Sequence, residues 1–210
     1  MTDEPNWLIW AREIQATAQT GLAFSRDPYD LERYRALLHL SARIMVEHTD
    51  ADLARIEGLF AREDGYATPK VGVRGAVFDE TGRVLMVRET ADEGRWTLPG
   101  GWADVNQTPA QSVVREIFEE SGYRTRAVKL AAVWDRARGR QPVEPFSVVR
   151  MFFVCALEGG KPRTSLETSE VGWFAENALP RELSLRRVVP EQITRMYAHW
   201  RDPALPTEFE

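Results

Sequence analysis

The amino-acid sequence predicts a mixed α/β domain that follows a small helical segment at the N-terminus. Apolar residues recur at helical spacing through residues 5–60, and β-rich runs take over after residue 70. A helix pattern lies between the second and third of these runs. Strands in hairpin-like order around a helix indicate a mixed α/β or α+β domain. We therefore expect a helical segment over residues 1–65 and the main domain over residues 66–210.

Two helices and a short third one are expected in the N-terminal segment. The first carries an apolar stripe with spacings of three and four residues, formed by Trp7, Trp10, Ile14, Ala18 and Leu22. The second begins after Asp27, a good N-cap, with Pro28 in its first turn, and the third covers about residues 53–60. Because such helices bury little by themselves, we expect them to pack on the main domain or on a second chain. Their role could be that of a plain appendage, a dimer-forming element or a cover for the substrate.

Strand runs dominate the rest of the chain. They cover residues 71–79, 83–89, 126–135, 147–157 and 170–175. The short turn ETG after the first run predicts a hairpin with the second, and a C-terminal helix is expected near residues 189–200. Cys155 lies in a strongly apolar run, so we expect it in the core.

The composition is that of an ordinary intracellular protein. Of its 210 residues, 43% are hydrophobic and 28% are charged, and no run reaches the roughly 20 apolar residues of a membrane helix. From the acidic start MTDEPNW we expect no secretory signal, and one cysteine excludes an intrachain disulfide. We expect a cytoplasmic protein with no membrane partner. Its net charge of −5 argues weakly against a dedicated polyanion-binding protein.

The helix between the second and third strand runs gathers acidic residues on one face. Thr108 is a suitable N-cap, and Gly122 is a suitable helix end. Glu116 and Glu120 are four residues apart and share a face, with Glu119 beside them. Carboxylates at this spacing repel one another, and a hard divalent cation such as Mg²⁺ turns this repulsion into a binding site. A solvated acidic face is the alternative that the helix alone leaves open.

The residues around this helix resemble the Nudix box, G-x5-E-x7-R-E-U-x-E-E-x-G-U, in which U is a bulky aliphatic residue. The matching positions are Gly101, Arg115, Glu116, Ile117, Glu119, Glu120 and Gly122. Gln107 replaces the first glutamate of the box, which in the family pairs in part with the arginine, and Tyr123 replaces the last aliphatic residue. Gln107 removes one carboxylate, and we expect this to affect metal number and rate more than the reaction class.

The resemblance implies a Nudix α/β/α sandwich with a mixed sheet, over roughly residues 70–180. It also implies a hydrolase that uses Mg²⁺ or Mn²⁺ to cleave the diphosphate of a nucleoside diphosphate linked to another moiety. By position, Glu116 and Glu120 would be the main metal ligands, Glu119 would complete the shell and the Gly100 carbonyl would be a backbone ligand. The catalytic residues that we expect are Arg115, Glu116 and Glu119, with Glu167 and Glu170 of a later loop as further candidates for the base.

Substrate selectivity is expected to come from residues outside the box. Arg136, Arg138 and Arg140 form a basic cluster beside Asp135, and such a cluster can hold a phosphate or a ribose. The aromatic candidates for stacking a base, each of which also fits a core position, are Trp134, Phe146, Phe152 and Trp173.

The N-terminal stretch WLIWAREIQATAQTGLAFSRDPYDLERY is similar to the helical extension of a bacterial Nudix subgroup that acts on X-linked nucleoside diphosphates and includes CDP-choline pyrophosphatase-like members. This similarity implies CDP-choline, ADP-ribose and related compounds as the first substrates to test, and a homodimer formed through the helices. Two alternatives stay open. One is hydrolysis at the 5′ end of RNA, and the other is a non-catalytic nucleotide sensor, which Gln107 alone supports.

Overall fold

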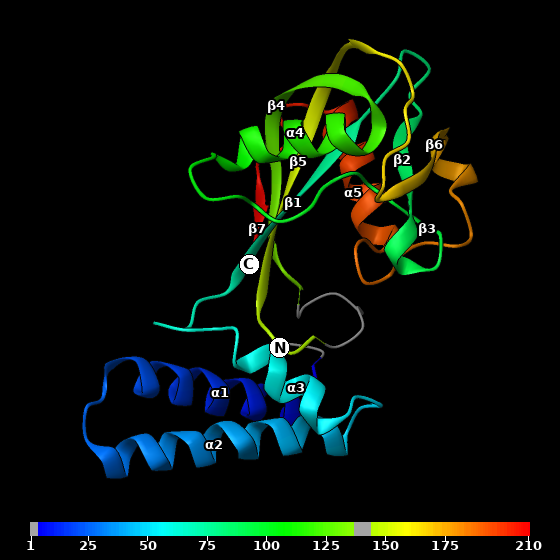
Figure 1. Cartoon of the computed structure of the whole chain (residues 1–210). Helices are drawn as coiled ribbons and strands as arrows, with labels where there is room; N and C mark the ends of the chain where they lie inside the picture. The colour runs from blue at the N-terminus through cyan, green and yellow to red at the C-terminus, as the bar shows by residue number, and fades with distance from the viewer. Residues whose placement is uncertain (1–3, 137–143) are drawn as a thin grey trace. The chain divides into compact units, whose positions relative to one another are not determined.

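The computed structural model describes residues 4–136 and 144–210, and the chain divides into two compact units (Figure 1). The first unit comprises Met1–Lys70 with Val143–Ser147, and the second comprises Val71–Pro142 with Val148–Glu210. In the described part of the chain, no helix has the length and apolar character needed to cross a membrane.

The first unit is built from helices α1 (Asn6–Phe24), α2 (Pro28–Glu47) and α3 (Leu53–Phe60). As predicted, Asp27 caps α2, and its carboxylate accepts hydrogen bonds from the backbone N–H groups of the first turn. The core of this unit consists of Leu8, Ala11, Ala42, Met45, Ile56 and Phe60.

The buried face of α1 differs from the predicted stripe. Its buried residues are Leu8, Ala11, Gln15, Ala18 and Gln19. Of the predicted set only Ala18 is fully buried, and Trp10 is 58% exposed. The small side chain of Ala11 lets α2 come close enough for the Ser41 hydroxyl to donate to the Ala11 carbonyl at 2.7 Å. An indole at that contact would hold the two helices apart, so helix–helix packing selects a face that hydrophobicity alone does not.

The described residues of the second unit contain two sheets and two α-helices. One sheet has the order β1 (Lys70–Val77), β5 (Val148–Gly160), β4 (Tyr123–Asp135) and β7 (Glu208–Phe209). The other has the order β3 (Arg95–Thr97), β2 (Val84–Glu89) and β6 (Thr168–Phe174). The helices are α4 (Pro109–Ser121) and α5 (Pro190–Arg201). Short 3₁₀ turns occur at η1 (Thr90–Asp92) and η3 (Glu176–Ala178).

Strand pairing confirms a mixed α/β fold and corrects one detail. β4 pairs antiparallel with β5 and parallel with β7. The predicted hairpin of the first two strands is confirmed only at its turn, where the Asp79 N–H donates to the Arg83 carbonyl at 3.0 Å and Phe78 forms an isolated antiparallel bridge with Val84. Beyond the turn the prediction is wrong, because β1 and β2 belong to different sheets. The strands β3 and β7, with three and two residues, were not predicted.

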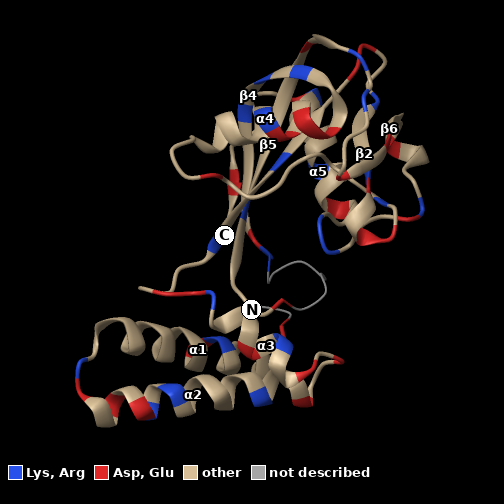
Figure 2. Cartoon of the chain, viewed as in Figure 1, with Lys and Arg blue, Asp and Glu red and all other residues tan. Residues whose placement is uncertain are grey.

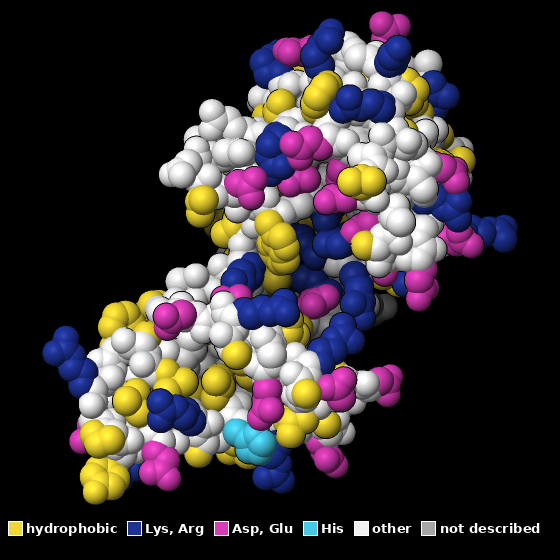
Figure 3. Space-filling model, viewed as in Figure 1, with side chains coloured by type: hydrophobic (Ala, Val, Ile, Leu, Met, Phe, Trp, Pro, Cys, Tyr) yellow, Lys and Arg dark blue, Asp and Glu magenta, His cyan; other side chains and the backbone are white. Residues whose placement is uncertain are grey.

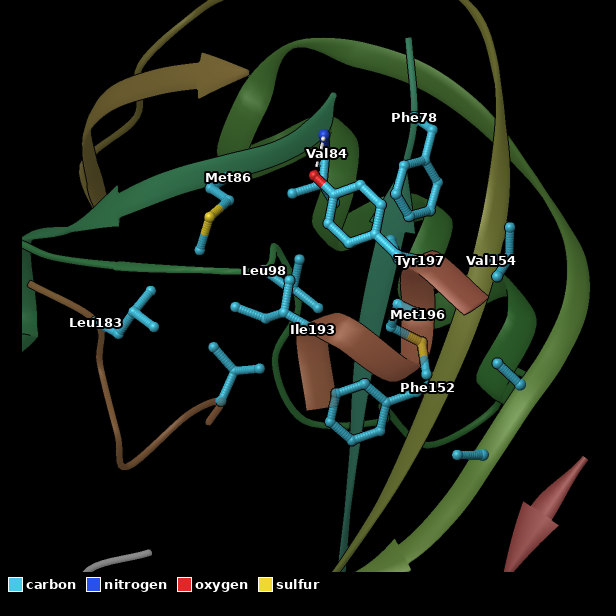
Figure 4. Close-up of a cluster of buried hydrophobic side chains, with 14 residues drawn as sticks. Phe78, Val84, Met86, Leu98, Phe152, Val154, Leu183, Ile193, Met196 and Tyr197 are labelled. Atoms are coloured by element: carbon cyan, nitrogen blue, oxygen red, sulfur yellow. Dashed lines mark hydrogen bonds between the residues drawn. The ribbon is translucent and has the colours of Figure 1, made fainter. Parts of the chain in front are cut away.

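Two apolar clusters hold the helices on the sheets. α4 packs through Val113 and Ile117 into one cluster, which includes Cys155 in its predicted buried position. α5 packs through Ile193 and Tyr197 into the other, where the Tyr197 hydroxyl accepts a hydrogen bond from the Val84 N–H at 3.3 Å (Figure 4). Leu98 is buried in this second cluster immediately before the Pro99–Gly100–Gly101 turn, so the core fixes the start of that turn.

Candidate active site

Local sequence signals determine both ends of α4. Thr108 and Gln111 form a capping box, in which the Thr108 hydroxyl accepts from the Gln111 N–H and the Gln111 side chain accepts from the Thr108 N–H. At the other end Gly122 has φ 77°, a left-handed conformation that favours glycine. The helix therefore begins and ends where the sequence predicted, and this fixes the direction in which its glutamates point.

Glu116 and Glu120 are buried on the inward face of α4. Glu120 Oε2 accepts a hydrogen bond from the Gly100 N–H at 2.9 Å. Burial raises the pKa of Glu120 to about 7, with smaller contributions in the same direction from the Glu116 and Glu89 carboxylates. Burial also raises the pKa of Glu116. The two carboxylates thus lie where ionisation is costly unless a cation joins them.

The Gly100–Gly101 turn leaves no room for a side chain beside this pair. A Cβ atom at Gly101 would lie 2.6 Å from Glu116 Oε1. A Cβ atom at Gly100, where φ is 146°, would lie 2.1 Å from the Val73 carbonyl oxygen. The paired glycines therefore allow the carboxylates to lie directly against the backbone.

A buried arginine from β1 completes the inner part of the site. Arg74 Nη1 donates to the carbonyl oxygens of Leu98 at 3.0 Å and Gly100 at 2.5 Å. Burial lowers the pKa of Arg74, and the attraction of Glu120 opposes this effect. Arg74 was not predicted, because an arginine within a strand run carries no signal until the sheet places it beside the glycine turn.

On the outer side of α4, Arg115 gathers four oxygen-bearing side chains. Figure 2 shows acidic and basic residues together on this helix. It lies 3.0 Å from Glu116, 2.6 Å from Glu119 and 2.9 Å from Asp104. Its Nε donates to Gln107 Oε1 at 3.2 Å. Gln107 therefore accepts the hydrogen bond, and Asp104, which the sequence analysis did not select, supplies a nearby carboxylate.

The remaining acidic candidates lie in other contacts. Glu170 pairs with Arg88 at 2.5 Å, and Glu167 lies in an exposed loop whose backbone bonds to Thr90. In the hydrogen bonds and ion pairs of the described residues, the side chains of these two glutamates do not meet the carboxylates of α4. Their proposed role as bases stays a prediction.

The substrate-binding candidates lie at the end of β4. Trp134 packs against Phe152, with ring centroids 5.0 Å apart, and the Asp135 N–H donates to Glu210 at 3.0 Å. Arg136 is buried, whereas Arg138 and Arg140 lie outside the described residues. Among the other aromatic candidates, Phe152 is fully buried, Trp173 donates to the Tyr123 hydroxyl, and Phe146 belongs to the first unit.

The site provides two buried carboxylates as ligands for a divalent cation, but not a complete coordination shell of protein ligands. Within residues 4–136 and 144–210, no three His, Cys, Asp or Glu side chains converge as a metal cluster. Glu116 and Glu120 provide hard oxygen donors whose pKa values are raised mainly by burial. Such a pair fits Mg²⁺ or a similar ion, which keeps several waters and few protein ligands. The predicted further ligands, Glu119 and the Gly100 carbonyl, are engaged by Arg115 and Arg74.

Comparison with known proteins defines the class to which this fold and site belong. Residues 68–194 match the family model described as the NUDIX domain. The chain therefore belongs to the Nudix hydrolase family, as the spacing of its box predicted. Residues 5–60 match a second model, described as a UDP-X-like, N-terminal oligomerisation domain.

Three relatives illustrate the similarity. The Bacillus subtilis (strain 168) protein YjhB, which carries the provisional name ADP-ribose pyrophosphatase, is 42% identical over 99% of this chain and 98% of its own. The crystal structure of an ADP-ribose pyrophosphatase from Streptococcus suis 89-1591 has 34% identity and a TM-score of 0.62, over 68% of this chain and all of its own. The crystal structure of a UDP-X diphosphatase has 27% identity and the same TM-score, over 98% of each chain.

Proposed function

We propose that this protein hydrolyses the diphosphate bond of ADP-ribose or a related nucleoside diphosphate linked to another moiety. The products would be a nucleoside monophosphate and a phosphorylated second product. The observation that carries the proposal is the buried Glu116–Glu120 pair against the glycine turn, because burying two neighbouring carboxylates is costly and a bound cation offsets that cost. The names of YjhB and of the Streptococcus suis enzyme support ADP-ribose as the first substrate to test.

The proposed division of labour follows the contacts of the site. Glu116 and Glu120 would hold Mg²⁺ or Mn²⁺, and such an ion would neutralise charge on the diphosphate and make a nearby water more acidic. Glu119, whose side chain is 55% exposed, is the proposed acceptor of the proton from the attacking water, and Arg115 orients it through its 2.6 Å ion pair. Arg74 holds the Gly100 carbonyl and so keeps the glycine turn against the carboxylates.

We further propose a homodimer formed through the helical unit. On that unit hydrophobic side chains reach solvent (Figure 3). They include Trp10, Phe24 and Tyr29, the last two exposed by 68% and 70%. Exposed aromatic residues gathered on one small unit mark an interaction surface. The description of the matching family model as an oligomerisation domain supports a second copy of the chain as the partner.

The test is a hydrolysis panel in ¹⁸O-labelled water, with Mg²⁺, with Mn²⁺ and with EDTA. The panel contains ADP-ribose, CDP-choline, a UDP-sugar, NADH, a diadenosine polyphosphate, a nucleoside triphosphate and a short 5′-triphosphorylated RNA. We expect metal-dependent release of a nucleoside monophosphate from the diphosphate conjugates, and the label identifies the phosphorus that water attacks. Turnover of the RNA alone would show that the substrate is an RNA 5′ end and not a nucleoside diphosphate conjugate. If no compound is hydrolysed with either metal, the proposed activity is contradicted.

A further inference from the structure

An irregular segment of the second unit, residues 182–188, is held more tightly than a surface connection requires. The backbone of Glu182 and Ser184 exchanges hydrogen bonds with Trp96 at 2.8 Å each, and the Ser184 hydroxyl donates to Asp92 at 2.6 Å. From the other sheet, the buried Arg150 donates to the carbonyl oxygens of Arg186 and Arg187, both at 2.6 Å. Hydrogen bonds with three elements, β3, η1 and β5, therefore hold the backbone of this segment.

The side chain that this segment presents is an arginine in a fixed orientation. Arg187 donates through Nε and Nη2 to the two oxygens of Glu89, at 3.0 Å and 2.5 Å. A guanidinium group has five N–H donors, so this bidentate pair leaves the Nη1 donors unused in the hydrogen bonds of the described residues. The Arg187 side chain is 34% exposed, so these donors can reach solvent or a ligand.

This arginine belongs to the same charged neighbourhood as the glutamates of α4. Glu89 lies opposite Thr168 in the register of β2 and β6, just beyond an irregularity in the pairing. The Thr168 hydroxyl in turn donates to the Glu120 carbonyl at 2.7 Å. The charges of Glu120, Glu89 and Arg187 all act on the buried Arg74.

We propose that Arg187 binds a phosphate of the substrate in this active site, and that Glu89 is the positioning residue that orients it. A polyphosphate approaching Glu116 and Glu120 meets negative charge, and a guanidinium with free donors beside the pair compensates for it. Arginine suits this role because its planar donor fork matches phosphate oxygens. The inference deepens the proposed function and rests on it. A purely structural ion pair is the competing explanation, and the kinetics and melting temperatures below distinguish the two.

Steady-state kinetics with ADP-ribose test the proposal on wild type, R187A, R187K and R186A. We expect R187A to raise KM about ten- to a hundredfold, as the loss of a charge-assisted hydrogen bond predicts, with kcat changed less than about threefold. The KM of R187K should lie between those of R187A and wild type, because lysine keeps the positive charge but lacks the planar pair of N–H donors. R186A is the matched control, since Arg186 is the exposed neighbour and carries the same charge, and its KM should stay within about twofold of wild type.

The role of Glu89 is tested with E89Q and the double variant. E89Q should raise KM less than R187A does, and E89Q combined with R187A should be no worse than R187A alone, because the two residues act as one unit. A KM of R187A equal to that of R186A, with a lowered melting temperature, would make the pair structural and overturn the proposal.

Calorimetry separates this proposal from the proposed activity. Wild type, R187A and R186A are titrated with an α,β-methylene analogue of ADP-ribose, which resists hydrolysis, in the presence of Mg²⁺. Weaker binding to R187A than to R186A supports the role of Arg187 even if wild type hydrolyses none of the panel compounds. Equal binding to the two variants contradicts it whether or not the protein is an enzyme.

Discussion

The helices α1 and α4 each bury a pair of polar side chains four residues apart, and the two pairs behave differently. On α1 the pair is Gln15 and Gln19, and Gln15 Nε2 donates to Gln19 Oε1 at 2.7 Å. Gln19 Nε2 lies 3.2 Å from the Gly65 carbonyl oxygen. An amide both donates and accepts, so the pair satisfies itself and needs no ligand.

The pair on α4, Glu116 and Glu120, cannot satisfy itself in this way. Ionised carboxylates only accept hydrogen bonds. Burial raises the pKa of both, and repulsion from Glu119 adds to the shift at Glu116 and repulsion from Glu116 to that at Glu120. The same spacing on a helix thus gives a structural contact with amides and a site that attracts a cation with carboxylates. Buried carboxylates with raised pKa values therefore point to function, whereas a buried amide pair that satisfies itself does not.

The largest effect is expected from making the α4 pair resemble the α1 pair. E120Q keeps the shape of the side chain and removes one charged oxygen donor, so kcat/KM should fall on the order of a hundred- to a thousandfold. Turnover of the panel substrate measures this loss. E158Q provides the matched control, because Glu158 lies at an exposed position of β5 and should keep full activity. Wild-type activity of E120Q would contradict the conclusion that the charge of the α4 pair, unlike the α1 pair, serves function.

The thermal stability of E120Q, measured in EDTA and compared with that of wild type, gives a second test of the buried carboxylate. The pKa of Glu120 is about 7 in the folded protein, against an ordinary value of 4.5, so the folded state keeps a proton that the unfolded chain releases. The stability contributed by this group is complete below about pH 4.5 and is lost as the pH rises through about 7. The melting temperature of metal-free wild type should therefore fall relative to E120Q across this window.

A smaller effect is expected from making the α1 pair resemble the α4 pair. Q19E places a carboxylate at a buried position and removes the donor to Gly65, so it should reduce the free energy of unfolding by about 2 kcal/mol. Urea unfolding followed by circular dichroism measures this loss. T17E is the control, because Thr17 is exposed on the same helix and receives the same charge. Equal stability of Q19E and T17E would show that the amide pair is not needed.

The two helices also show how far the sequence predicts this protein. The ends of α4 and its acidic face depend on local signals, from Thr108 to Gly122, and these were predicted correctly. Which face of α1 is buried depends on how closely α2 approaches Ala11. The spacing of apolar residues in the sequence does not predict this distance. Arg74, Glu89 and Arg187 are distant in sequence, and only the folded sheets bring them to the glutamates. These three residues can be identified only from the folded structure, which shows that their charged side chains lie near the Nudix box.

The smallest effect is expected from restoring the first glutamate of the box. Q107E places a carboxylate beside Arg115, but Asp104 already lies 2.9 Å from the same guanidinium. The added charge is therefore partly redundant, and we expect kcat/KM to rise no more than about threefold. D104N should lower kcat/KM in the wild-type background and have less effect in Q107E, because either carboxylate can neutralise Arg115. If Q107E instead raised activity a hundredfold, the natural glutamine would be a disabling residue, and the α4 pair would lack a charge that Asp104 does not replace.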